Sequence, residues 1–176
     1  SGRTGVSVFL FRLYSGYIYW DRNADKKTAE SFHHSVITSI KLFEDCKKIK
    51  TLKGCLYDKE LHMSMPVRIL VGMYVVYLKE WFKVFEKDRF LIIKTEEYPQ
   101  DIKTHVQRIF QFLGLSKCRN EMEKIVKQSR KNVKKQAIGP MWQETRQILD
   151  DLYRSYNEEL AELLADNKYL WKDDPK

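Results

Sequence analysis

The chain has 176 residues, of which 43% are apolar and 13% are aromatic. This length and composition suit one folded domain with a real core and argue against disorder. The formal charge of +8 and the pI near 9.3 predict attraction to polyanions, and leave nucleic acid, a phosphorylated nucleotide and an acidic polysaccharide open. No apolar run approaches the roughly 20 residues that span a bilayer, so we expect no membrane anchor in this chain.

A candidate phosphate contact stands close to the start of the chain. Ser15 follows Arg12 by about one helical turn. A hydroxyl at a helix start suits a phosphate, because the free N–H groups and the dipole of a helix N-terminus favour anions. On the pattern alone, a surface salt bridge with a helix-start serine is favoured. Residues 1–11 contain no Gly-x-x-x-x-Gly-Lys-Ser/Thr phosphate loop, so we interpret the chain as part of an enzyme.

An amphipathic helix is predicted over residues 28–48, with Thr28 as its N-cap. Its apolar stripe consists of Phe32, Val36, Ile40 and Phe43. His33 and His34 lie beside this stripe, which favours a surface or boundary role for both over catalysis.

A basic loop is predicted over residues 47–54, between Cys46 and Cys55. Their separation of nine residues allows a disulfide in an oxidising compartment and free thiols in the cytosol, and both alternatives stay open. With Cys118, the three cysteines form no C-x-x-C and no zinc spacing, so we expect no metal site.

Pro66 is expected to open a second helix, with a broad apolar face that is buried on two sides. Residues 90–93 are short, apolar and partly β-branched, which predicts a buried parallel strand. Pro99 is expected to open the next helix, with Gly114 just after its end. The core-facing residues predicted for this helix are Ile102, Val106, Ile109, Phe110 and Leu113.

The rest of the chain is predicted to form a short helix over 120–127, a basic loop over 129–140 and a final helix over 143–166. In the loop, Gly139 and Pro140 fix a turn after several lysines. Exposed backbone N–H groups with lysines nearby can bind an anion. On the pattern alone, a solvated basic surface is the usual interpretation of such a run.

Together these segments resemble the carboxy-terminal half of the Golgi carbohydrate sulfotransferases, in particular those that act on N-acetylgalactosamine 4-sulfate of chondroitin or dermatan sulfate. The resemblance covers about residues 12–172. Its segments are RLYSGYIY at 12–19, MPVRILVGMY at 65–74, RFLIIKTEEY at 89–98, IGPMW at 138–142, and the stretch 149–171.

The resemblance implies an α/β, P-loop-kinase-like fold, of which this chain would hold the helix-rich carboxy-terminal portion without the amino-terminal phosphosulfate-binding strand, loop and helix. It divides the chain into a divergent segment, 1–11, and a partial sulfotransferase domain, 12–176. It also implies 3′-phosphoadenylyl sulfate (PAPS) as sulfuryl donor. Ser15 matches the serine that binds the 3′-phosphate of PAPS, whereas the arginine that accompanies it in the family falls at Ser7 here.

Further roles follow from the same resemblance. Lys134, Lys135 and Gly139 match a late loop that closes over the donor. Arg68 and Tyr74 match a motif beside the cleft, and are expected to contact a sulfated glycosaminoglycan acceptor. Cysteines of matching spacing in the relatives favour a disulfide between Cys46 and Cys55, and the family resides in the Golgi lumen.

The catalytic residues of the family are expected upstream, so we expect this chain alone to be inactive. The alternative is a non-catalytic, basic module that binds a polyanion, such as a heparin-like polysaccharide or nucleic acid, although we expect no nucleic-acid partner. A nucleotide kinase fragment is a further alternative, but the chain offers neither the phosphate loop nor the Mg²⁺ ligands that it requires.

Overall fold

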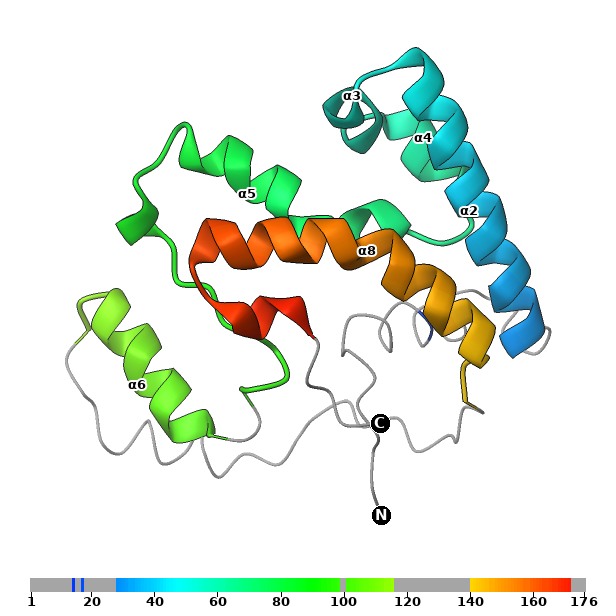
Figure 1. Ribbon diagram of the computed structural model, residues 1–176. Helices are drawn as coiled ribbons and strands as arrows, with labels where there is room; N and C mark the ends of the chain where they lie inside the picture. The colour runs from blue at the N-terminus through cyan, green and yellow to red at the C-terminus, as the bar shows by residue number, and fades with distance from the viewer. Residues whose placement is uncertain (1–13, 15–16, 18–27, 99–100, 116–139, 172–176) are drawn as a thin grey trace. The chain divides into compact units, whose positions relative to one another are not determined.

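The computed structural model describes residues 14, 17, 28–98, 101–115 and 140–171 (Figure 1). The chain forms two compact units, one of residues 1–81 with 138–176 and one of residues 82–137. The described residues form helices and turns, with no β-strand among them. The predicted boundary at residue 11 and the predicted helix over 120–127 lie outside the described residues.

Helix α2, Ala29–Ile49, belongs to the first unit and confirms the prediction for residues 28–48. Thr28 caps it: its side chain accepts from the N–H of Ser31, whose hydroxyl accepts from the N–H of Thr28. This reciprocal pair satisfies two backbone donors at the helix start. Phe32, Val36 and Phe43 are fully buried.

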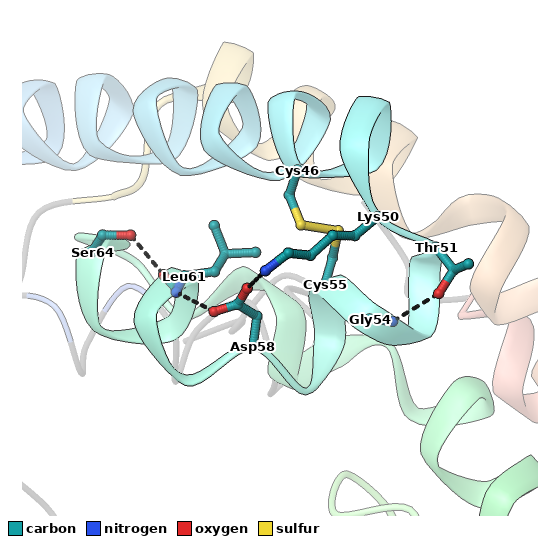
Figure 2. A network of polar contacts seen from close by, with 8 residues as sticks. All are labelled: Cys46, Lys50, Thr51, Gly54, Cys55, Asp58, Leu61 and Ser64. Carbon is teal, nitrogen blue, oxygen red and sulfur yellow. Dashed lines mark hydrogen bonds and ion pairs between the residues drawn. A yellow bond between two sulfur atoms is a disulfide. The ribbon is translucent and has the colours of Figure 1, made fainter.

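The end of α2 and the short helix α3 (Leu52–Leu56) occupy the region in which a basic loop was predicted over 47–54, and a second short helix, α4 (Lys59–Ser64), follows. The loop prediction was wrong because the polar residues Thr51 and Asp58 act as helix N-caps. Thr51 accepts from the N–H of Gly54 at 3.1 Å, and Asp58 accepts from the N–H of Leu61 at 3.0 Å (Figure 2).

The single helix predicted from Pro66 is two elements. A 3-10 turn, η2 (Ile69–Gly72), precedes helix α5 (Tyr74–Phe82), and Met73 between them leaves the helical conformation with ψ of 57°. Pro66 lies before the first element rather than in it. The expected burial on two sides is also wrong, because Trp81 near the end of α5 is 53% exposed.

Helix α8, Gln143–Leu164, confirms the final predicted helix and ends two residues earlier than expected. It stops there because Ala165 adopts the left-handed conformation, with φ of 51°. The chain then forms the short 3-10 turn η4, Asn167–Leu170. Leu149, Tyr153 and Leu160 bury one face of α8. The hydroxyl of Tyr153 donates to the carbonyl oxygen of Ile69 at 2.6 Å, which ties α8 to η2.

In the second unit, the strand predicted over 90–93 is extended backbone that pairs with no strand among the described residues. It follows the 3-10 turn η3, Lys87–Arg89, and its side chains are only half-buried. The ring of Phe90 packs at 5.0 Å from that of Phe82. The apolar composition of residues 90–93 therefore indicated a segment that packs against its neighbours. The hydrogen bonds of a β-sheet also require a partner strand, which the local sequence does not specify.

Helix α6, Ile102–Phe112, confirms the helix predicted after Pro99, although Asp101 is its N-cap. Gly114 has φ of 66°, and its N–H donates to the carbonyl oxygen of Gln111, while the N–H of Leu115 donates to that of Phe110. This pattern is the Schellman motif, in which glycine avoids the steric cost of a left-handed residue. Of the predicted core residues, Val106 is buried and Leu113 is 58% exposed, so the prediction for Leu113 was wrong.

Candidate functional site

The residues on either side of Ser15 pack on the first turns of α2. The rings of Tyr14 and Tyr17 lie 5.0 Å and 5.3 Å from the ring of Phe32. The hydroxyl of Ser35, one turn along α2, donates to the Tyr17 hydroxyl at 3.1 Å. Tyr14 is 4% exposed, and burial raises the pKa of its phenol. Ser15 itself lies outside the described residues.

The start of α8 packs on the same turn of α2. Nδ1 of His33 lies 2.8 Å from Oγ1 of Thr145, a hydrogen bond in which the imidazole tautomer decides which group donates. The His33 ring also lies 5.5 Å from the indole of Trp142, the N-cap residue of α8. Thr145 is fully buried and Trp142 is 42% exposed. The surface or boundary role predicted for His33 agrees with its half-buried side chain.

These contacts bring together the flanks of both predicted donor-binding segments. Tyr14 and Tyr17 enclose Ser15 in sequence, and Trp142 follows Gly139 by three residues. Both flanks contact residues 32–35 of α2. Lys134, Lys135 and Gly139 lie outside the described residues. We call residues 32–35 the hub turn.

The predicted acceptor residues stand at the two ends of η2. Arg68 is the N-cap residue of η2, is exposed, and forms no ion pair with any described carboxylate. Tyr74 begins α5 directly after the break at Met73, and is 37% exposed. The buried Tyr153 supports this stretch from α8. Burial, and secondarily the neighbouring Tyr74, raise the pKa of the Tyr153 phenol, so it stays a hydrogen-bond donor to Ile69.

Similarity to known proteins identifies the family. Residues 11–147 match the sulfotransferase domain family. The chain is 37% identical over 162 residues to Carbohydrate sulfotransferase 15 of Nototodarus sloanii, a match that covers 90% of this chain and 99% of that relative. The chain belongs to the carbohydrate sulfotransferase family.

Two mammalian relatives are also similar in sequence to most of this chain. Carbohydrate sulfotransferase 15 of Homo sapiens is 38% identical over 165 residues, and that of Rattus norvegicus is 37% identical over 165 residues. The chain spans 29% of the length of each, and each match covers 92% of the chain. No solved structure matches it. The family resemblance inferred from the sequence is therefore confirmed at the level of the carbohydrate sulfotransferases.

The sulfotransferase chain holds a disulfide between Cys46 at the end of α2 and Cys55 in α3, with an S–S distance of 2.02 Å and a Cα–Cα distance of 6.0 Å (Figure 2). The side chain of Cys55 is fully buried. The bond fixes α3 against the end of α2.

The lysines around this disulfide are paired with carboxylates. Nζ of Lys47 lies 2.8 Å from Oε1 of Glu44, and Nζ of Lys48 lies 2.7 Å from Oδ1 of Asp45. Lys50 pairs with Asp58 (Figure 2), and Lys53 pairs with Glu80 on α5. Because each of these ammonium groups already has an anionic partner, the basic run over 47–53 is a weak candidate for a polyanion site.

Neither a metal site nor a membrane-spanning helix occurs among the described residues. Within residues 28–98, 101–115 and 140–171, no cluster of three His, Cys, Asp or Glu side chains suits a metal ion. No helix in the same ranges is long and apolar enough to cross a membrane.

Sequence reasoning missed three residues that organise the site. Thr145 and Tyr153 looked like ordinary members of an amphipathic helix, and Trp142 like the end of a matching segment. The one available signal was that Trp142 and Thr145 closely follow the Gly139 turn in sequence. Their contacts with α2 and η2 join residues more than 80 positions apart, which no local pattern specifies.

Proposed function

We propose that this chain serves the transfer of a sulfuryl group from PAPS to a sugar hydroxyl of a glycosaminoglycan, with N-acetylgalactosamine 4-sulfate of chondroitin or dermatan sulfate as the acceptor unit. The observation that carries the proposal is the hub turn, on which the flanks of both donor-binding segments pack. Membership of the carbohydrate sulfotransferase family supports the reaction class.

On the donor side, we assign the 3′-phosphate of PAPS to the hydroxyl of Ser15. Lys134 and Lys135 supply positive charge, and the backbone N–H of Gly139 supplies a further donor. Charge-assisted hydrogen bonds of this kind are stronger than neutral ones, and exposed backbone N–H groups in a turn form anion sites.

On the acceptor side, we assign Arg68 to a sulfate group of the polysaccharide. A guanidinium matches the geometry of a tetrahedral oxyanion by donating two parallel hydrogen bonds. Its exposure, and the lack of a described carboxylate partner, support this role. The partly exposed Tyr74, two residues after the end of η2, offers a ring and a hydroxyl to a sugar.

Sulfuryl transfer resembles phosphoryl transfer in its requirements. The acceptor hydroxyl attacks in line, a base takes its proton, and cations stabilise the charge that develops on the leaving phosphate. The oxygen–sulfur bond to the sugar forms as the bond to the nucleotide phosphate breaks, which releases adenosine 3′,5′-bisphosphate. We assign no described residue as the base. The Cys46–Cys55 disulfide supports residence in an oxidising compartment such as the Golgi lumen.

The proposal is tested by measuring the binding of chondroitin 4-sulfate and of adenosine 3′,5′-bisphosphate to the protein. Binding of the polysaccharide that weakens in Arg68→Ala, with unchanged binding in the exposed control Arg89→Ala, supports the acceptor assignment. The expectation that this chain alone is inactive is tested separately, by incubating the protein with radiolabelled PAPS and chondroitin 4-sulfate; label in the polysaccharide would overturn it.

The same protein distinguishes the polyanion-binding alternative. A non-catalytic polyanion module binds heparin with a steep salt dependence and shows no preference for adenosine 3′,5′-bisphosphate over other nucleotides. Specific, saturable binding of that nucleotide supports the sulfotransferase assignment. Binding of all nucleotides in proportion to their charge contradicts it.

A further inference from the structure

Arg68 is the exposed centre of a tight turn whose two flanking residues are buried. Val67 and Ile69 are 3% and 0% exposed, whereas the side chain of Arg68 is exposed. The N–H of Ile69 donates to the carbonyl oxygen of Val67 at 2.8 Å, and Arg68 has φ of −77° and ψ of 58°. These values are typical of an inverse γ-turn, which three residues form with one hydrogen bond. The turn therefore exposes Arg68 while its two neighbours anchor the backbone in the core.

Ser39 of α2 holds the first end of this turn. Its side chain is fully buried, and its oxygen accepts from the N–H of Val67 at 3.1 Å. The hydroxyl proton has another partner, because it donates to the carbonyl oxygen of Ser35 at 2.8 Å. The Ser39 oxygen is therefore the acceptor in its bond with Val67. A buried backbone N–H outside a regular helix or sheet needs such a partner, so this bond fixes where the turn begins.

Tyr153 of α8 holds the other end of the turn. Its hydroxyl donates to the carbonyl oxygen of Ile69 at 2.6 Å, and both side chains are buried. The turn, Ser39 and Tyr153 all belong to the first compact unit. The backbone on the two sides of Arg68 is therefore bonded to two different helices, α2 and α8.

We propose that Ser39 and Tyr153 are positioning residues for the acceptor polysaccharide: they hold the backbone of Arg68 so that its guanidinium is presented to a sulfate group. This inference rests on the proposed acceptor role of Arg68 and adds two buried residues that act through it. Its physical basis is preorganisation. Ordering a segment on binding costs affinity, and a backbone that is already fixed avoids part of that cost.

The test measures the affinity of the protein for chondroitin 4-sulfate by isothermal titration calorimetry, together with the melting temperature of each variant. Ser39→Ala is expected to weaken binding roughly two- to tenfold, which corresponds to the cost of ordering one side chain. Tyr153→Phe is expected to weaken binding by a similar factor, because it releases the other end of the turn. Its ring stays in the core, so this variant carries the test if Ser39→Ala does not fold.

Thr38→Ala is the matched control for Ser39→Ala. Thr38 is the next residue on α2, is exposed, and its hydroxyl donates to the carbonyl oxygen of His34 one turn earlier. Ser39 makes the same kind of bond to Ser35, but only Ser39 also accepts from Val67. Thr38→Ala is therefore expected to leave the affinity for chondroitin 4-sulfate unchanged.

A double variant separates positioning from a purely structural role. If Ser39 acts through Arg68, then Ser39→Ala combined with Arg68→Ala binds the polysaccharide no more weakly than Arg68→Ala alone. A merely structural role of Ser39 would lower the melting temperature without changing the affinity of the folded protein.

The outcomes distinguish this inference from the proposed function. Unchanged affinity in folded Ser39→Ala or Tyr153→Phe would overturn the positioning role of that residue, and additive losses in the double variant would overturn the role of Ser39, while the acceptor role of Arg68 stands. Unchanged affinity in Arg68→Ala would overturn the acceptor assignment, and this inference with it. Losses in both single variants, with no further loss in the double variant, support the proposal.

Discussion

Replacing Tyr153 by phenylalanine probes the link between α8 and the turn that carries Arg68. The Tyr153 hydroxyl donates to the carbonyl oxygen of Ile69 at 2.6 Å, and both residues are buried. The break at Met73 leaves that carbonyl without the partner that a continuous α-helix would provide, because the N–H of Met73 donates to Leu70 instead. Tyr153→Phe removes one oxygen atom and, with it, the hydrogen bond to the Ile69 carbonyl.

The expected loss follows from the burial of both groups. Loss of one hydrogen bond costs about 0.5–1.5 kcal/mol, and the apolar ring of Tyr153 remains and opens no large cavity. For a chain of this length, a loss of about 1 kcal/mol lowers the melting temperature by roughly 2–4 °C. Urea denaturation followed by circular dichroism gives the free energy of unfolding, and differential scanning calorimetry gives the melting temperature.

Tyr156→Phe is the matched control. Tyr156 lies one turn later on α8, is half-buried against the same core, and its hydroxyl forms no hydrogen bond with the described residues. We expect its removal to change stability by less than about 0.5 kcal/mol. Equal effects of the two variants would refute the assignment of a structural hydrogen bond to Tyr153.

Three further predictions concern single features of the fold. Replacing Cys46 and Cys55 by serine should lower the free energy of unfolding by about 2–3 kcal/mol, because the closed loop of about ten residues restricts the unfolded chain. In urea titrations, dithiothreitol should destabilise the wild type and leave the stability of the variant unchanged. The hydrogen bond from Lys50 holds the pKa of Asp58 below its ordinary 3.8. Asp58 therefore stabilises the fold above about pH 3.8, and this effect is lost as the pH falls through the lower pKa of the folded state. The Asp58→Asn variant should lose less stability on acidification than the wild type, and identical pH profiles of the free energy of unfolding would contradict this reasoning. Gly114→Ala should lower the free energy of unfolding by about 1–2 kcal/mol. The cost comes from the positive φ alone, since no atom lies within 4 Å of the added methyl group. An unchanged free energy of unfolding would show that the turn relaxes to accept alanine.

Helices with local signals could be predicted from the sequence. Thr28 with its apolar stripe specified α2, and Gly114 specified the end of α6. These features depend on residues within one or two turns of each other. The same reasoning failed at Pro66, where the turn η2 replaces a continuous helix and receives a hydrogen bond from Tyr153, 84 positions away in the sequence.

The candidate site was predictable only as separate segments. Resemblance to the family selected Ser15, Gly139 and Arg68, and no sequence pattern relates their positions in space. The contact of His33 with Thr145 spans 112 positions, and such pairings arise from tertiary packing. Residues 90–93 are extended but pair with no strand among the described residues, because pairing requires a second segment that local composition does not identify.

The most direct test of the account compares adenosine 3′,5′-bisphosphate with adenosine 5′-monophosphate in calorimetric titrations of the wild-type protein and of Ser15→Ala. The account predicts that the bisphosphate binds at least about tenfold more tightly, since a charge-assisted contact to the 3′-phosphate distinguishes the two ligands. It also predicts that Ser15→Ala reduces this preference. Equal affinities for the two nucleotides, or a preference that Ser15→Ala leaves unchanged, would contradict the proposed donor site.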